Sequence, residues 1–104
     1  MKFLMGKVVA TENARAVLQR AGQRPYEFLR RHKNGEWGMI SEEEQFDNEL
    51  SLHAGLHVWS EYLTHHDEVI RIFTNPDRSG TVLYTPDEES SLEKFEVVYT
   101  SSKP

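Results

Sequence analysis

The sequence predicts an α+β fold: an N-terminal strand, three helices and then an antiparallel meander of three to four strands. Two observations predict this class. Up to Gly55, apolar residues recur every three or four positions, which is the period of a helix. After Gly55, apolar and polar residues alternate in short runs separated by turn-forming residues, which is typical of strands. We therefore expect the helices to cover one face of a sheet.

The first strand is predicted over residues 6–11, and the first helix follows between Thr11 and Gly22. The segment 6–11 is short and contains β-branched residues. Thr11 is a favourable N-cap, and Gly22 is a favourable stop. A single apolar stripe at helical spacing lies between them and consists of Ala14, Val17, Leu18 and Ala21.

Two further helices are predicted from their ends. The second begins at Pro25, a common first-turn residue, and ends before Asn34 and Gly35. The third begins with a capping box of Ser41 and Glu44 and ends at Gly55. We interpret its apolar face as the side that carries Phe46, Leu50, His53 and Ala54.

The second half of the chain predicts strands over residues 56–63, 69–74 and 81–84, with turns at 65–67 and 75–80. A last alternation of Phe95, Val97 and Tyr99 is either a further strand or the end of a short helix begun near Ser91, and its β-branched neighbours favour the strand. We expect one compact domain over residues 1–100 and a disordered tail over residues 101–104.

Composition excludes several classes of protein. The chain has 104 residues and no cysteine, which excludes disulfides, thiolate nucleophiles and cysteine-ligated zinc or iron–sulfur sites. The N-terminal apolar run is broken by Gly6 and Lys7, so we expect no export signal. No apolar stretch is long enough to cross a bilayer. We expect a cytoplasmic protein that does not associate with a membrane.

The net charge of −5 hides a segregation of charge along the chain. Residues 15–33 carry six cations and one acid, residues 36–49 carry six acids and no cation, and a second acidic cluster spans residues 87–96. These segments form either opposed patches that bind partners or neighbouring helices that neutralise each other. The patches would bind a host protein through Arg30, Arg31, Glu42, Glu43 and Asp47, or nucleic acid through Arg15, Arg20, Arg24, Arg30, Arg31 and Lys33.

The histidines and carboxylates do not predict a metal site. His53 and His57 have the spacing of two ligands on one helix, but Gly55 lies between them and ends the helix. The acids at positions 42–44 are explained by a helix N-terminus, which favours negative charge. The phosphate-binding glycine motifs are also missing, so we expect no metal and no cofactor.

One turn is a candidate for catalysis. Asp77 and Arg78 place an acid and a fixed cation on one turn, and together with His65 or His66 they could bind phosphate and cleave RNA without a metal. The alternative is an Asx-type turn in which Asp77 bonds to the backbone. Trp37 has two alternative roles. It either packs the loop between the second and third helices or is exposed and anchors an interface.

Three segments resemble a group of small uncharacterised proteins encoded on bacterial plasmids, integrative elements and prophages. The segments are His32 to Gly38, Asp47 to Glu49 and Asp77 to Leu83. The group has a Val-Ala-Thr-type strand, a His-x-x-Gly-Asp-Trp-Gly turn and an Asp-Arg-Ser-x-Thr hairpin. This chain has Glu36 in place of the usual Asp and an extra segment after Glu88. The resemblance implies a mobile-element setting and a bacterial cytoplasm, but no particular activity.

We expect a small mobile-element accessory protein that binds a host macromolecule through its charged faces, with an anti-defence inhibitor as one specific form. The enzymatic alternative is a small metal-independent ribonuclease or toxin that uses the Asp77 and Arg78 turn with the nearby histidines. A third alternative is a weak nucleic-acid binder that uses the helices between Arg15 and Lys33. We favour binding over catalysis.

Overall fold

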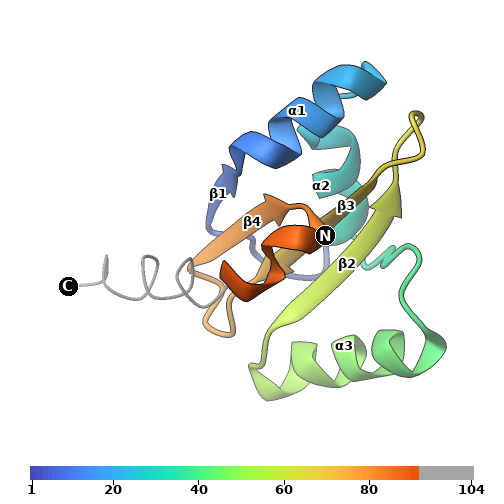
Figure 1. The fold of residues 1–104 in the computed structure, drawn as a ribbon. Helices are drawn as coiled ribbons and strands as arrows, with labels where there is room; N and C mark the ends of the chain where they lie inside the picture. Colours follow the sequence, from blue (N-terminus) through green and yellow to red (C-terminus); the bar gives the residue numbers. More distant parts are fainter. Residues whose placement is uncertain (92–104) are drawn as a thin grey trace.

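The computed structural model describes residues 1–91 and confirms the α+β class (Figure 1). The last predicted strand, at Phe95 to Tyr99, and the predicted tail at 101–104 lie outside the described residues. The elements follow in the order β1 (Lys7–Ala10), α1 (Glu12–Ala21), α2 (Pro25–Lys33), α3 (Glu42–Ala54), β2 (Val58–Leu63), β3 (Val69–Thr74), β4 (Gly80–Tyr84) and the 3₁₀ helix η1 (Pro86–Ser91).

The sheet has the strand order β1-β4-β3-β2. The strands β2, β3 and β4 form the predicted antiparallel meander. β1 joins it parallel to β4, with Lys7 opposite Gly80 and Ala10 opposite Leu83, so the sheet is mixed. All three helices lie between β1 and β2 in the sequence. This long connection takes the chain from β1, at one edge of the sheet, to β2 at the other edge.

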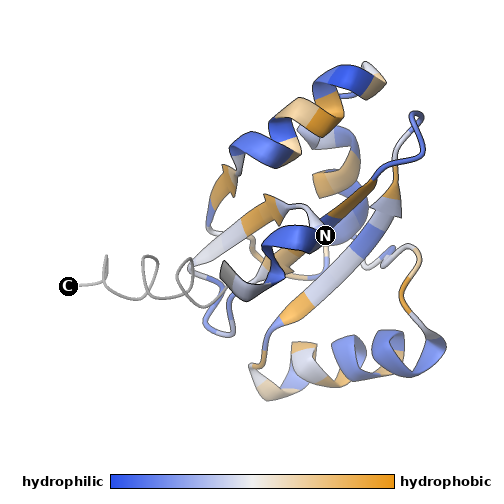
Figure 2. Cartoon of the chain, in the orientation of Figure 1, coloured by the Kyte–Doolittle hydropathy of each residue, from blue (hydrophilic) through white to orange (hydrophobic). Residues whose placement is uncertain are grey.

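α1 and α2 cover one face of the sheet. Alternate strand residues point toward them, and Ile70, Ile72 and Leu83 are fully buried against Leu18 and Phe28. In Figure 2, hydrophobic and hydrophilic segments alternate along α1, as they do in an amphipathic helix. The first two helices therefore sit as predicted, with Thr11 and Arg24 as their N-caps.

The expectation that α3 lies on the same face with an apolar side is wrong. Phe46 is 63% exposed and Leu50 is 51% exposed, whereas Asn48 and Ser51 are buried. The reason is a polar contact with the edge of the sheet. Asn48 Nδ2 donates to Trp59 O at 2.7 Å, and Trp59 N donates to Asn48 Oδ1 at 3.2 Å. The helix is thus fastened along β2 with its apolar side outward.

The segment before α3 closes the same edge. Met39 N donates to Glu61 O at 2.7 Å, and Glu61 N donates to Trp37 O at 3.2 Å. Gly38 permits this approach because its φ is +76° and a Cβ there would lie 2.0 Å from Glu61 O. Backbone groups of Trp59 and Glu61 that would otherwise point to solvent therefore have partners.

A polar chain crosses the core beneath α2. His32 is fully buried, with Nδ1 at 2.6 Å from Ser60 Oγ and Nε2 at 2.9 Å from Thr74 Oγ1. Thr74 Oγ1 lies 2.7 Å from Thr81 Oγ1, which donates to Met5 O at 2.7 Å. This chain joins one helix, three strands and the N-terminal segment.

The donors in this series of hydrogen bonds fix the tautomer of His32. A threonine hydroxyl has one hydrogen, and that of Thr81 is used on Met5 O. Thr74 must then donate to Thr81, so His32 Nε2 carries the hydrogen that reaches Thr74. Ser60 consequently donates to an unprotonated His32 Nδ1.

Burial keeps the His32 imidazole neutral. Desolvation, with a smaller contribution from the charge of Arg78, lowers the pKa of His32 to about 3. The rings of Phe3 and Trp37 approach His32 edge-on, with centroids at 5.2 Å and 5.7 Å, and exclude water. A proton on this ring would be an uncompensated charge in the core.

Replacing Asn48 by leucine should lower the free energy of unfolding by about 1 to 3 kcal/mol, because backbone groups of Trp59 lose their partners while side-chain volume is kept. Urea denaturation measures this change. Asn13→Leu on the exposed side of α1 is the control and should have little effect. An Asn48→Leu protein as stable as the parent would contradict the role given to this amide.

Stability should fall in acid because of His32. The unfolded chain takes up a proton at this side chain near pH 6.5, and the native state does so only at about 3. The unfolded state therefore binds more protons between these values, and the free energy of unfolding decreases as the pH falls through that window. Ring ¹⁵N resonances report the protonation directly. At pH 5 they should show a neutral Nε2–H ring, and an imidazolium signal there would refute this assignment.

Candidate interaction surface

The structure does not bring the predicted catalytic residues together. His65 and His66 lie in the turn between β2 and β3, whereas Asp77 and Arg78 lie in the turn between β3 and β4. The two turns are at opposite ends of β3, which has six residues and so separates them by roughly 20 Å. No common site for phosphate chemistry results.

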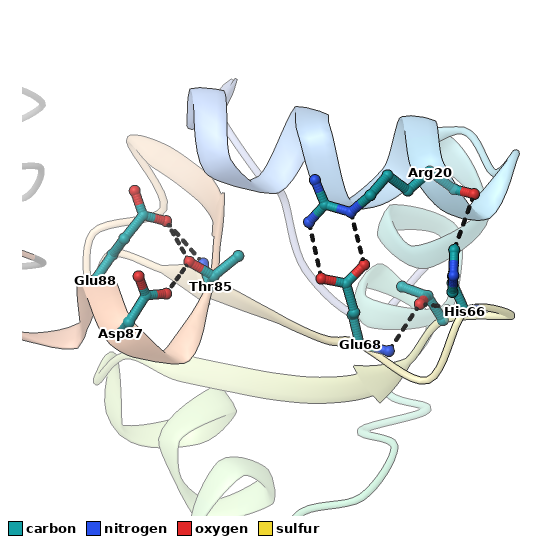
Figure 3. A network of polar contacts seen from close by, with 7 residues as sticks. Arg20, His66, Glu68, Thr85, Asp87 and Glu88 are labelled. Carbon is teal, nitrogen blue, oxygen red and sulfur yellow. Dashed lines mark hydrogen bonds and ion pairs between the residues drawn. The ribbon is translucent and has the colours of Figure 1, made fainter.

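The histidine turn is fastened to α1. The guanidinium of Arg20 forms a two-pronged contact with Glu68, with Nε to Oε1 at 3.0 Å and Nη2 to Oε2 at 2.8 Å (Figure 3). His66 Nδ1 lies 3.2 Å from Arg20 O, and His65 N donates to Gln23 Oε1 at 2.8 Å. The hydrogen bond from Arg20 lowers the pKa of the Glu68 carboxyl. These contacts hold the hairpin against the helix.

Arg78 has a structural role. Its guanidinium donates to the carbonyl oxygens of Leu56 at 2.7 Å, Asn75 at 3.1 Å and Ser51 at 3.3 Å. Ser79 N donates to Asp77 Oδ1 at 2.9 Å, which is the Asx-type turn that the sequence left as the alternative. Arg78 therefore ties the end of α3 to this turn.

Trp37 packs the loop between α2 and α3. It is 3% exposed, and its ring stacks on Phe3 with centroids 6.0 Å apart. Trp37 Nε1 donates to Glu49 Oε2 at 2.9 Å, and Lys2 Nζ lies 3.2 Å from the same carboxylate. Of its two proposed roles, the structure shows the packing one.

The basic helices and the acidic helix do not neutralise each other. Within residues 1–91, the ion pairs are Lys2 with Glu49, Arg20 with Glu68, and Arg71 with both Glu61 and Glu89. None joins α1 or α2 to α3, and the strands of the sheet lie between α1 and α3 in Figure 1. The cations of α1 and α2 form their own surface.

That basic surface is only partly available. Arg20 is occupied by Glu68, Arg31 lies over the ring of Tyr62 at 4.5 Å, and Lys33 lies over the ring of Tyr26 at 5.3 Å. The remaining cations of the predicted nucleic-acid set are exposed and are Arg15, Arg24 and Arg30.

The outward side of α3 combines acids and apolar groups. We call it the α3 crest and define it as Glu42, Glu43, Phe46, Asp47 and Leu50, which recur at helical spacing. All five are exposed. Within the described part of the chain, the three carboxylates make no side-chain hydrogen bond or ion pair, so the crest carries unneutralised charge around two exposed apolar side chains.

Sequence reasoning found the acids of the crest but placed Phe46 and Leu50 in the core. The signal that it passed over is that Glu42, Glu43 and Asp47 lie on the same side of the helix as Phe46 and Leu50, so this side is not a continuous apolar stripe.

Two hollows lie near the charged elements. One of about 350 Å³ lies between α3 and the beginning of β2 and is lined by Asp47, Leu56, His57 and Trp59 among others. Another of about 610 Å³ lies between α1 and η1. The charged side chains that line the second are already engaged, Arg20 with Glu68 and Asp87 with Thr85 (Figure 3).

Residues 1–91 contain no group of three or more histidine or carboxylate side chains placed to hold a metal ion. None of the helices in the same span combines the length and the apolar character that crossing a membrane requires. Comparison of the chain with protein-family models, with curated proteins and with solved structures gives no match.

Proposed function

We propose that this chain is a small accessory protein that binds a host protein, with the α3 crest as its contact surface. The partner would present a basic surface with apolar residues, such as the nucleic-acid-binding groove of a host protein, and inhibition of a defence protein is a specific form of this role. The resemblance to proteins of plasmids and prophages supports a bacterial, cytoplasmic setting.

One observation carries the proposal: Phe46 is 63% exposed amid three carboxylates that have no partner within residues 1–91. Single exposed apolar side chains are common on protein surfaces, whereas neighbouring ones with a rim of polar groups mark interaction sites, and Phe46 and Leu50 are neighbours on one side of α3. The ring of Phe46 and the side chain of Leu50 can supply buried apolar area, while the acids select a basic partner and speed its approach.

The crest is also held rigidly. Asn48 fixes the middle of α3 to β2, Arg78 fixes its end through Ser51 O, and the capping box of Ser41 and Glu44 fixes its start. A surface that is already ordered loses little conformational entropy on binding.

The nucleic-acid alternative has a narrower basis, in the exposed Arg15, Arg24 and Arg30 on α1 and α2. Three exposed cations would support weak, salt-dependent binding. The ribonuclease alternative loses its geometric basis, because His65 and His66 are remote from Asp77 and Arg78.

Affinity capture from bacterial lysate tests the proposal with matched variants. Phe46→Ser/Leu50→Ser and Asp47→Lys should each lose the captured partner, because they remove the apolar contacts or reverse a charge. The matched controls Tyr26→Ser/Leu63→Ser and Glu36→Lys alter similarly exposed residues elsewhere and should retain it.

All variants should keep the melting temperature of the parent, since the altered side chains are exposed. Capture that is equal in the crest variants and the controls would overturn the proposal.

A further inference from the structure

The outer side of β1 is an unpaired sheet edge within residues 1–91. Lys7 N donates to Ser79 O at 3.0 Å and Thr11 N donates to Leu83 O at 3.0 Å, so these residues turn their backbone groups toward β4. Neighbouring residues of a strand point their N–H and C=O groups to opposite sides. Val8 and Ala10 therefore direct two N–H and two C=O groups away from the sheet.

The two edges of the sheet are treated differently. The β2 edge is closed by Trp37 to Met39 and by the Asn48 amide. The β1 edge has no such cover among the described residues, and it has neither a proline nor a bulge within Lys7–Ala10. Natural proteins protect an open edge by these means and also by short strands and lysines, and β1 has four residues and begins with Lys7. Its outward backbone groups nevertheless remain open to pairing.

We propose that β1 pairs with β1 of a second copy of this chain, antiparallel, about a two-fold axis at Val9. This inference is independent of the α3 crest. This register places Val8 opposite Ala10 of the other copy, and the two-fold axis places Ala10 opposite Val8 of the other copy. Each such pair exchanges two backbone hydrogen bonds, so all the outward groups of both strands gain partners. A closed two-fold contact requires the antiparallel direction, because each strand must meet the same surface on its partner.

The side chains fit this register. Val9 would face its own copy across the axis, and β-branched residues are favoured in such cross-strand pairs. Val8, which is 41% exposed, would cover Ala10. Lys7 would lie opposite Thr11 and next to Glu12 of the other copy, while the two lysines lie at opposite ends of the pair. Opposite charges therefore meet and like charges are kept apart.

Sedimentation velocity from micromolar to millimolar concentration tests the proposal. The parent should dimerise reversibly. Val8→Pro removes the outward N–H of that residue without removing a hydrogen bond to β4, and it should leave a monomer at every concentration. Lys7→Glu should raise the dimer dissociation constant about tenfold, because two like-charged contacts replace two opposite ones. The double variant K7E/E12K should restore dimerisation.

The controls separate this interface from the crest and from misfolding. Phe46→Ser should leave the dimer dissociation constant unchanged. If Val8→Pro fails to fold, as judged by circular dichroism, the charge exchange decides the question. A parent protein that stays monomeric, a dimer that Lys7→Glu does not weaken, or a dimer abolished by Phe46→Ser would each overturn the proposal.

Discussion

The buried chain of hydrogen bonds from His32 to Met5 O is the constraint on which the rest of the structure depends. It requires a neutral imidazole, two threonines on neighbouring strands and a serine on a third, all at fixed distances. These partners set α2 across β2, β3 and β4 and hold the N-terminal segment beneath it. Polar groups in a core have few acceptable arrangements. This series of hydrogen bonds therefore fixes the register of the strands more tightly than apolar packing alone would.

The position of α3 follows from this arrangement. α1 and α2 occupy one face of the sheet, and the third helix lies along the edge of β2. Asn48 and Arg78 hold it there through backbone carbonyl and amide groups, and the half-buried Leu52 adds an apolar contact with the cluster of Phe3, Trp37, Ile40 and Val58. One side of α3 is therefore held against β2, and Phe46 and Leu50 on the other side remain in solvent.

The sequence predicted the parts of this fold that local rules determine. Caps, glycine stops and the change of apolar period gave the helices and the meander close to their observed bounds, because these features depend on neighbouring residues. The parallel pairing of β1 with β4 and the edge position of α3 depend on contacts between distant residues, such as Asn48 with Trp59, and no local pattern contains them. The same reason explains the candidate site. Its acids were visible in the sequence, whereas the exposure of Phe46 follows from the contact of Asn48 with Trp59, two residues on different elements whose pairing no local pattern contains.

We propose the α3 crest as the surface through which this protein binds its partner. Photo-crosslinking in bacterial cells tests it most directly, with p-benzoylphenylalanine placed at position 46 and, in a second protein, at position 26, which is 58% exposed on α2. The account predicts an adduct of discrete mass from position 46 and none from position 26. No adduct from position 46, or the same adducts from both positions, would contradict it.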